Sequence, residues 1–504
     1  MLLILFFIFI LTASVFIPKY VVILLALNLI IGLFLSIFQI IIALLPHFKL
    51  KRNQLKAKPF VSIFVPAYNE PPAILMQTLE MLSHLKYDHF EVMVIDNNTK
   101  DAAVWKPVET FIRTLGEKFQ FFHIDPLSGF KAGALNYLLE RMNPKSEYVA
   151  VIDADYMVNP NFLTTALSYF SGDDVALVQF PQHYRNCIKK NQPIADEYRH
   201  FFGIYMNMAN HLDCVLSTGT MSVYKSDVLT RIGGFRVESL TEDADVGLRI
   251  YGAGYRGIYI DHPIGYGLMP YDLEAYRKQK WRWSFGNAQS MKTLFMLFEK
   301  IPFKSWVGFL SHLTAWYHFN FLPFAVLAAF PIILYPAVPI TQYHKQLLIF
   351  ASLSIFITLV SKVLLFMVTL RKEKKFFIRA LQAFVVHMGM TLVYSEAWIA
   401  CIFQRKFAFE RTNKFFLEKM PSLIKNSYAE FLLGLWYLLG AVVAIRWGSP
   451  LVAVAFFIAA SVLFSIYYVY WKISPTKAYS KKILASMERK YRPFIDGELV
   501  KNKT

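Results

Sequence analysis

The chain has 504 residues, of which 56% are hydrophobic and 16% aromatic, and its formal net charge is +18. The basic residues collect beside long apolar blocks, where membrane topology explains them, so the charge does not indicate binding to nucleic acid. Its 3 scattered cysteines are too few for a disulfide framework or a thiolate metal site. The composition therefore predicts a multi-pass membrane protein with one soluble domain.

Two apolar blocks at the start of the chain are both predicted to span a membrane. Residues 2–17 are just long enough and residues 21–45 comfortably so, and we interpret the pair as an anchor hairpin, not a cleaved signal peptide. The loop that follows is basic, with Lys49, Lys51, Arg52, Lys56 and Lys58. Since cytoplasmic loops are enriched in Lys and Arg, residues 1–58 are expected to hold the next domain on the cytosolic side.

Residues 59–270 have the composition of a soluble domain, in which short apolar runs alternate with helix-like stretches. The runs are FVSIFVPAY, EVMVID, FQFFHI, EYVAVID and VALVQF. This alternation predicts an α/β, Rossmann-like domain with a mostly parallel sheet that helices cover on both faces. In such sheets the ligand crevice lies at the carboxyl ends of the strands, where Asp96, Asp153 and Asp155 fall.

The C-terminal half is predicted to hold four more spans, which makes about six in the whole chain. They are residues 313–335, 347–370, 428–445 and 451–471. Residues 271–306 and 376–404 are amphipathic or interrupted by charges, and we interpret them as interfacial or re-entrant. The C-terminal membrane region is thus residues 307–471, and residues 472–504 are expected to form a basic cytoplasmic tail.

The pair Asp153 and Asp155 is the first candidate for chemistry. In a strand the two side chains point the same way, so two carboxylates repel each other unless they face water or share a cation. A lone Asp-x-Asp more often marks a solvated turn, but Mg²⁺ or Mn²⁺ held by one or two carboxylates would suit a diphosphate ester. The sequence has no Walker A motif, no Gly-x-Gly-x-x-Gly after the first strand, no Cys/His cluster and no Gly-x-Ser-x-Gly, so P-loop, dinucleotide, zinc and nucleophile-elbow chemistry are not expected.

Four further segments carry conspicuous polar or aromatic residues: PAYNEP, GFKAGALN, LTEDADVGLRI and QKWRW. Each alone has an ordinary interpretation, as a turn, a solvated helix start, a helix cap or interfacial aromatics. Together with Asp96 and Asp153-Ala154-Asp155, and in this order, they closely resemble the motifs of membrane-integrated, processive-type family 2 glycosyltransferases, which include bacterial cellulose synthase and hyaluronan synthase. The resemblance covers about residues 60–290, and VIDNNTKD and GFKAGALNYLL look most like the bacterial β-glucosyltransferases of glucan synthesis.

The resemblance implies a GT-A fold, a cytosolic UDP-sugar donor, expected to be UDP-glucose, inversion at the anomeric carbon, and Mg²⁺ or Mn²⁺ as cofactor. The implied nucleotide-sugar ligands are Tyr68, Glu70, Asp96, Lys131, Asp153, Gln279 and Arg282. Asp155 would hold the metal, and Asp243 would be the general base that takes the proton from the acceptor hydroxyl. Gln279 and Arg282 would steady the leaving diphosphate.

On the acceptor side the resemblance implies Trp283 as a stacking surface at the mouth of a membrane channel, together with Glu242, Thr218 and Gly219. The segment STGTMSVY, which contains Thr218 and Gly219, differs from the Phe-Cys-Gly-Ser wording of cellulose synthases, so the linkage and the acceptor stay open. Within residues 405–425, FERTNK resembles the family's gating loop with an arginine in place of valine. It carries over two residues, Thr412 and Lys414.

The first functional hypothesis is a synthase in the inner or plasma membrane that extends a β-glucan on the cytosolic face and passes it through its own spans. Its partners would be the donor, the growing glycan, membrane lipid and any accessory export subunits. Trp316, His318 and Asn320 could line such a path or serve ordinary packing roles. The alternative is transfer of a single sugar to a lipid acceptor. A third hypothesis is a degenerate subunit that only binds nucleotide sugar. All the motif acids are present, which argues against it.

Overall fold

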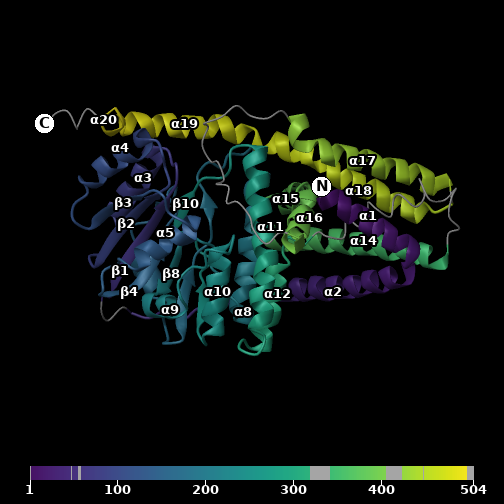
Figure 1. Cartoon of the computed structure of the whole chain (residues 1–504), viewed down its shortest axis with the longest axis horizontal. Coiled ribbons are helices and arrows are strands. Elements are labelled where there is room, and N and C mark those ends of the chain that lie inside the picture. The colour runs from purple at the N-terminus through teal and green to yellow at the C-terminus, as the bar shows by residue number, and fades with distance from the viewer. Residues whose placement is uncertain are drawn as a thin grey trace.

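The computed structural model describes residues 2–46, 48–54, 58–317, 341–403, 423–446 and 448–496. Figure 1 shows a strand-containing domain at one end, long helices at the other, and α11 (Leu273–Met296) and α12 (Phe303–Leu313) between them. The proposed gating-loop residues Thr412 and Lys414 lie outside the described residues, as do His318 and Asn320.

The soluble domain is built on a mostly parallel sheet, as the sequence predicts. Within the described residues the sheet has 7 strands in the order β3-β2-β1-β4-β8-β6-β9, and β8 alone runs antiparallel to its neighbours. The strands are β1 (Phe60–Ala67), β2 (Phe90–Asn97), β3 (Phe119–Ile124), β4 (Ser146–Val151), β6 (Val175–Gln179), β8 (Ser222–Lys225) and β9 (Arg256–Tyr259). A second, smaller sheet joins β5 (Met157–Val158), β10 (Gly265–Gly267) and β7 (His183–Tyr184).

Helices cover both faces of the large sheet because its central strands are apolar on both sides. In β1, Ile63 and Val65 pack into one buried cluster and Phe64 into another, which is the two-residue alternation of a strand. The covering helices are α3 (Pro72–Ser83), α4 (Ala102–Ile112), α5 (Phe130–Leu139), α6 (Phe162–Leu167), α9 (Ser226–Arg231) and α10 (Glu242–Gly252). The five predicted apolar runs are confirmed as β1, β2, β3, β4 and β6.

The register of the parallel strands places the predicted polar residues at one edge. Ala67 at the end of β1 pairs with Asp96 near the end of β2, and the N–H of Ile152, just after β4, bonds to the carbonyl of Phe64 in β1 at 3.0 Å. The chain leaves both strands at this edge and runs directly into Tyr68 and Asp153. The three strand ends therefore share one crevice, as the topology requires.

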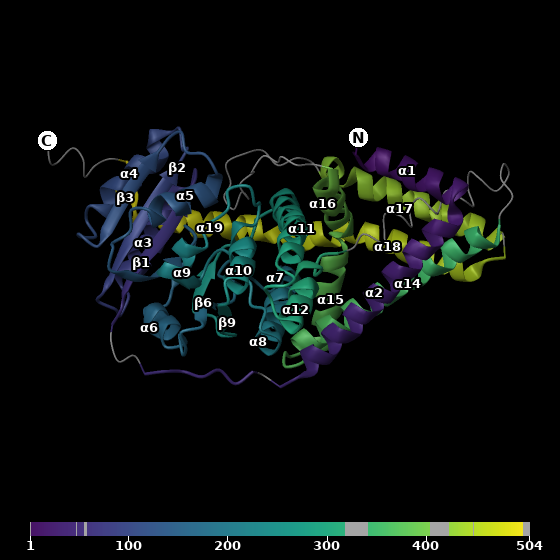
Figure 2. The same ribbon diagram turned by 60° about the horizontal axis from the view of Figure 1, so that its bottom comes forward.

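A continuous helical segment follows the sheet and changes its winding in the middle. It consists of α7 (Gln192–His200), the π-helix η1 (Phe201–Met206) and α8 (Asn207–Leu212). A π-helical turn inside an α-helix is rare and often occurs at functional sites. The segment lies between the soluble domain and the long helices, beside α11, which carries QKWRW (Figure 2).

Four helices in the described part of the chain are long and apolar enough to cross a membrane. They are α2 (Pro18–Leu44), α14 (Gln342–Leu370), α17 (Leu423–Arg446) and α18 (Pro450–Ile473), which correspond to four of the predicted spans. The first predicted span forms the 15-residue helix α1 (Leu2–Phe16), and most of the span predicted at 313–335 lies outside the described residues. α15 (Phe376–Met388) and α16 (Thr391–Phe403) are bent by 41° at a short break, as a broken span or a re-entrant loop would be.

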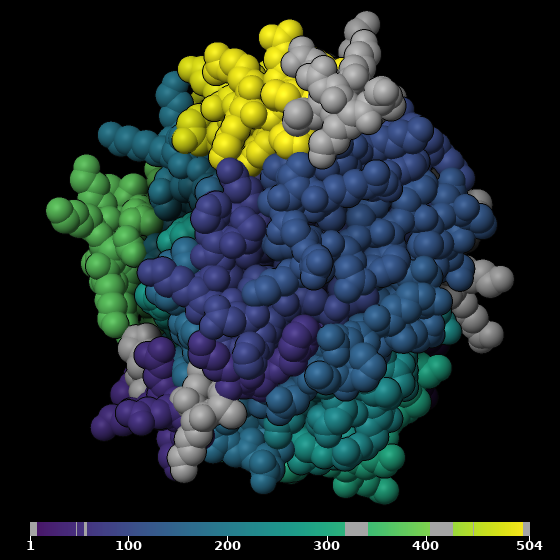
Figure 3. Space-filling model, turned by 90° about the vertical axis from the view of Figure 1, so that its left-hand side faces the viewer, coloured from purple at the N-terminus to yellow at the C-terminus, as the bar shows by residue number. Residues whose placement is uncertain are grey.

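The basic tail folds back onto the soluble domain. α19 (Pro475–Lys490) and α20 (Arg492–Ile495) lie along α3 and α4, and Figure 3 shows this yellow segment lying across the blue domain. Lys490 Nζ lies 2.5 Å from the Glu80 carboxylate, and the Tyr491 ring is buried against Phe111. The described part of the predicted cytoplasmic tail is thus an ordered strap that joins α18 to the soluble domain.

Candidate functional site

A pocket of about 510 Å³ opens at the carboxyl ends of β1, β2 and β4. Of the predicted donor-side residues, those that line it are Tyr68, Glu70, Lys131, Asp153, Asp155 and Arg282. The wall also includes residues to which no motif assigned an individual role, namely Asn97, Asn98, Lys100, Asp125 and Phe130. The first three belong to the polar run directly after Asp96, and Phe130 belongs to GFKAGALN, whereas Asp125 lies in neither segment. We refer to this cavity as the donor pocket.

Lys131 links the two halves of the donor pocket. Its Nζ lies 2.7 Å from Asp153 Oδ1 and donates to the carbonyl of Gly219 at 2.8 Å. Burial alone would lower the pKa of Lys131, but the nearby carboxylates of Asp153, Glu242 and Asp243 raise it above its usual value. Lys131 is therefore a fixed positive charge that holds the loop after β4 against the loop before β8.

Asp155 is buried, and its side chain is part of the pocket wall. Its Oδ2 accepts the N–H of Leu268 at 2.7 Å, so one oxygen is oriented by the backbone. Among the described residues, no group of 3 or more His, Cys, Asp or Glu side chains is arranged to hold a metal ion. Asp153 and Asp155 nevertheless fit a hard divalent cation of the kind that takes one or two carboxylates and completes its shell with phosphate oxygens and water.

Asp96 lies behind the pocket wall and does not line it. Its carboxylate accepts the Thr99 hydroxyl at 2.8 Å and contacts His123 Nδ1 at 3.0 Å, and the His123 ring stacks on Trp105 with centroids 4.2 Å apart. Burial raises the pKa of Asp96, while the bonds from Thr99 and His123 oppose that shift. In this conformation Asp96 positions the loop of Asn97 and Asn98, which does line the pocket.

The two predicted donor-side residues of the QKWRW segment lie in different places. Arg282 lines the donor pocket, whereas Gln279 is buried and accepts a hydrogen bond from the Tyr198 hydroxyl. Gln279 is thus placed to support α11 beside Trp283, whose ring also contacts Tyr198 edge-on at 5.7 Å.

A much smaller cavity of about 50 Å³ lies on the other side of Asp243, and we call it the acceptor chamber. Aromatic rings form much of its wall, with Trp283 and Trp316 at a centroid distance of 5.5 Å and Phe201 stacked on Trp316 at 5.0 Å. The hydroxyl oxygens of Thr218 and Thr241, which line it, are buried without a hydrogen-bond partner in the described residues. Rings beside unpaired hydroxyls suit a sugar, which offers both apolar C–H faces and hydroxyl groups.

Asp243 is the acceptor-chamber residue that lies beside Lys131 of the donor-pocket wall. It lines the acceptor chamber, and a Cβ built on Gly219 would lie 2.6 Å from Asp243 Oδ2 and 3.4 Å from Lys131 Nζ. Gly219 has φ +77°, so a side chain there would be both strained and crowded. The predicted acceptor residue Gly219 therefore acts by letting Asp243 and Lys131 approach the backbone.

The pKa values at this junction are shifted upward. Burial raises the pKa of Asp243, against the opposing charges of Lys131 and Arg282. Burial and then the neighbouring Asp243 raise the pKa of Glu242 to about 7. A carboxylate with a raised pKa is a stronger base than one in water, which is what proton abstraction from a hydroxyl requires.

Lys280 is a residue that the sequence analysis missed. Its side chain is 1% exposed; its Nζ lies 2.5 Å from Glu197 and 4.2–5.9 Å from the ring centroids of Tyr198, Tyr276, Trp283 and Trp316. His387 Nδ1 contacts the other oxygen of Glu197 at 3.0 Å. A cation among rings is attracted to their faces, so Lys280 positions the chamber's tryptophans and ties them to α15.

Residues 58–286 match a family model described as glycosyltransferase like family 2. Residues 58–286 form a family 2 glycosyltransferase domain. The match begins just before β1 and ends within α11, after Trp283, so it contains both cavities' motif residues. The mostly parallel sheet of the glycosyltransferase domain is the GT-A-like arrangement that the sequence predicts.

The similar curated proteins are cellulose synthase catalytic subunits described as UDP-forming. One from Xanthomonas axonopodis pv. citri is 27% identical over 241 residues, and one from Pseudomonas fluorescens is 29% identical over 244 residues. These matches cover 46% and 47% of this chain and 32% of each relative. A solved mannosyltransferase from Pyrobaculum calidifontis, in complex with GDP-Man and Mn²⁺, aligns at 19% identity with a TM-score of 0.49, over 74% of this chain and 99% of its own. The sequence similarity to the cellulose synthases concerns the glycosyltransferase domain, and the chain spans about a third of their length.

Proposed function

We propose that this protein is an inverting, divalent-metal-dependent glycosyltransferase that uses UDP-glucose to extend a β-glucan. Donor binding would occupy the donor pocket and the growing glycan would occupy the acceptor chamber. The names of the UDP-forming relatives support UDP as the leaving group. The single observation that carries the proposal is that Asp243, in the wall of the aromatic chamber, lies beside Lys131, in the wall of the charged pocket.

The geometry supports different roles for the residues on the two sides of the anomeric carbon. On the acceptor side the Asp243 carboxylate would accept the proton of the attacking hydroxyl while that oxygen bonds to the anomeric carbon. On the donor side the bond from the anomeric carbon to the diphosphate breaks, and UDP leaves with the electron pair. Lys131 and Arg282 are the cations there that would offset the negative charge developing on the diphosphate.

A divalent cation fits between the aspartates and the diphosphate. Asp155, together with Asp153, would hold it, and a bound Mg²⁺ or Mn²⁺ would neutralise phosphate charge. Asp153 already faces Lys131, so two positive groups would meet the diphosphate from the same wall. Tyr68, which is 42% exposed at the pocket mouth, and Glu70 are placed to contact the nucleoside.

The acceptor chamber adjoins the helices that we propose span the membrane. Trp283 would stack on the terminal sugar of the glycan, and the unpaired hydroxyls of Thr218 and Thr241 would bond to its hydroxyl groups. Trp316 extends the aromatic wall toward the membrane helices, which supports passage of the product in that direction. The soluble domain would lie in the cytosol, where nucleotide sugars are made.

The decisive experiment follows the product. The full chain in lipid nanodiscs, with Mg²⁺ or Mn²⁺, is given radiolabelled UDP-glucose, UDP-galactose and UDP-N-acetylglucosamine in separate reactions, and the product is partitioned between water and organic solvent. We expect UDP-glucose to give a high-molecular-weight aqueous product that a linkage-specific β-glucanase cuts.

Other outcomes redirect or reject the proposal. Label that enters the organic phase at one sugar per lipid would make this a glycolipid synthase. A polymer from a different UDP-sugar would keep the reaction and change the substrate. Full activity in EDTA would reject the metal requirement and the role given to Asp155.

A further inference from the structure

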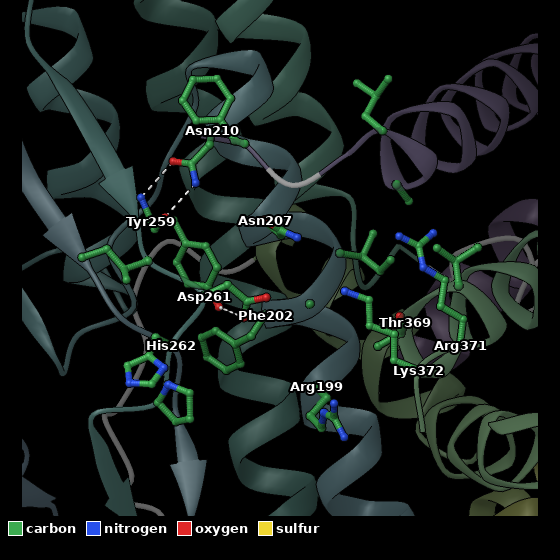
Figure 4. Close-up of a pocket in the computed structure, with 18 of the residues that line it drawn as sticks. Arg199, Phe202, Asn207, Asn210, Tyr259, Asp261, His262, Thr369, Arg371 and Lys372 are labelled. Carbon is green, nitrogen blue, oxygen red and sulfur yellow. Dashed lines mark hydrogen bonds between the residues drawn. The ribbon is translucent and has the colours of Figure 1, made fainter. Parts of the chain in front are cut away.

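A second large cavity, of about 740 Å³, lies away from the donor pocket, where the soluble domain meets the ends of two membrane helices. Figure 4 shows Arg371 and Lys372 on one side and Asn210 and Tyr259 on the other. Its walls come from the C-terminal end of α2 and the loop after it, from η1 and α8, from the loop after β9, and from the end of α14. We call it the junction pocket.

The charges in the junction pocket favour an anion. The Glu373 carboxylate forms ion pairs with Arg199 at 2.8 Å and with Arg379 at 2.6 Å, so its charge is already neutralised. Arg371 and Lys372 then face the carboxylate of Asp261. The remaining polar wall consists of Asn207, Asn210, His183 and His262.

The opposite wall of the junction pocket is apolar. Ala43, Leu45 and Phe48 come from the end of α2 and the loop after it, and Val368 comes from the last turn of α14. Both helices end here, at Leu44 and Leu370, beside the basic runs that we expect at the cytosolic surface. The cavity therefore pairs cations with apolar surface at the depth of lipid headgroups.

The π-helix η1 separates the junction pocket from the acceptor chamber. Phe202 lines both cavities, and Phe201 stacks on the chamber residue Trp316. A Cβ built on Gly203 would lie 3.4 Å from Thr369 at the end of α14, so η1 packs tightly against this helix. A ligand in the junction pocket would contact the back of the same π-helical turn that forms the chamber wall.

From this arrangement we propose that the junction pocket binds the phosphate headgroup of an anionic phospholipid, with its acyl chains against α2 and α14. Arg371 and Lys372 bind the phosphate, and Asn207 binds one of its ester or glycerol oxygens, while the Asn210 side chain is held by the backbone of Tyr259. Basic pockets between membrane helices on the cytosolic side bind anionic headgroups in this way. The inference rests on the proposed membrane placement of α2 and α14 and is independent of sugar transfer.

The test measures lipid binding without any sugar donor, by native mass spectrometry of the full chain in detergent with phosphatidylglycerol or phosphatidylcholine. We expect one phosphatidylglycerol to be retained in preference to phosphatidylcholine. The double variant R371Q/K372Q should weaken that binding by about tenfold or more. The matched control K374Q/K375Q removes the same charge from exposed residues outside the pocket wall and should bind like the unchanged protein.

Each of the other outcomes either contradicts or supports the proposal. Equal losses in the two double variants would show a general effect of surface charge and overturn the site. Displacement of the lipid by inorganic phosphate at the same concentration would assign the pocket to a soluble phosphate compound. Retention of both lipids alike would remove the anion preference. Preserved binding in R371K, with the melting temperature of all variants unchanged, would support the role of the positive charge itself.

Discussion

The donor pocket and the acceptor chamber differ in how they are built, although Asp243 of the chamber lies beside Lys131 of the pocket. The donor pocket is wide and polar, and much of its wall comes from the ends of parallel strands and the loops that follow them. The acceptor chamber is about a tenth of its volume, at about 50 Å³ against 510 Å³, and its rings come from η1, α11 and the turn after α12. The first is a property of the sheet topology, and the second depends on how helices pack.

Different kinds of interaction therefore hold the residues of the two sites in place. On the donor side, charged side chains at strand ends pair with charges on helices, as Asp153 after β4 does with Lys131 in α5 at 2.7 Å. On the acceptor side a buried cation, Lys280, and its partner Glu197 hold the rings. A change in the donor pocket should therefore act on chemistry or donor affinity, whereas a change beneath the acceptor chamber should act on packing and product length.

The largest effect is expected from a substitution of Asp243. Asp243→Asn keeps the size of the side chain but removes its ability to accept a proton, and general base catalysis contributes about 10²–10⁴ in rate. We expect kcat for sugar transfer to fall by about that factor, with the affinity for UDP largely retained because the donor pocket is unaltered. UDP release assays and calorimetric UDP binding measure the two quantities.

The matched control is Glu238→Gln, which removes a carboxylate from an exposed position in the loop before α10 and should leave turnover unchanged. Undiminished turnover in Asp243→Asn would exclude Asp243 as the base. An equal loss of UDP binding would place its role in donor affinity instead.

The next effect tests the packing beneath the chamber. Lys280→Met leaves Glu197 buried without its closest cation, and breaking a buried pair in this way costs about 3–5 kcal/mol. We expect a clear fall in melting temperature and a shift toward shorter products, since the rings around Lys280 lose a common partner. Lys278→Met, at an exposed position two residues away, should change stability by no more than about 0.5 kcal/mol.

A double variant that also removes the Glu197 charge separates the effect of packing from the effect of charge. The double variant Lys280→Met with Glu197→Gln leaves no unpaired ion and should recover most of the lost stability. If product length stays short in the double variant while stability returns, the cation itself positions Trp283. Normal product length in Lys280→Met would contradict the positioning role.

The contrast also explains what the sequence could predict. Short apolar runs that alternate with helix-like stretches identified five strands of the large sheet, and the rule that ligands bind at strand ends drew attention to Asp153 and Asp155, which line the donor pocket. The motifs also suggest Asp96 and Gln279 as ligands, and this stays a prediction; in the structure Asp96 lies behind the donor-pocket wall and Gln279 lies beside Tyr198. A motif shows which residues are near a site, but only tertiary packing decides which of them face it.

The residues that the sequence did not reveal also depend on tertiary packing. Lys280 is an unremarkable lysine in QKWRW until Glu197, more than 80 residues earlier, is brought to 2.5 Å from it. The ordering of the basic tail along α3 and α4 was equally hidden, since its apolar contacts are a few residues such as Met487 and Tyr491. Long-range contacts of this kind have no local pattern in the sequence.

A smaller effect should follow from removing the stacking surface itself. Trp283→Ala takes one ring from the chamber but leaves Asp243, Lys131 and Arg282 in place. We expect elongation to fall about tenfold, the factor that corresponds to 1.4 kcal/mol of lost binding, with residual hydrolysis of the donor by water. Product length on gels and free glucose release measure the two reactions. Trp283→Phe should be less affected, and normal chain length in Trp283→Ala would contradict a stacking role.

The smallest expected effect is a shift in pH dependence, which tests whether the two acids at the junction influence each other. A base acts only when deprotonated, and burial raises the pKa of both Glu242 and Asp243, so transfer should decline as the pH falls through the raised pKa of Asp243. Glu242→Gln removes a negative neighbour of Asp243, which makes Asp243 easier to deprotonate.

We therefore expect the acid limb of kcat in Glu242→Gln to move to lower pH, by at most about one unit, equivalent to 1.36 kcal/mol. A rate profile from acid to neutral pH, with Glu238→Gln as the charge-matched control, measures this shift. An unchanged limb would mean that Asp243 titrates independently of Glu242. A shift toward higher pH would mean that the Glu242 charge assists the base, by holding Lys131 or Arg282 near Asp243, whose pKa both cations lower, and would assign Glu242 to the donor side of the junction.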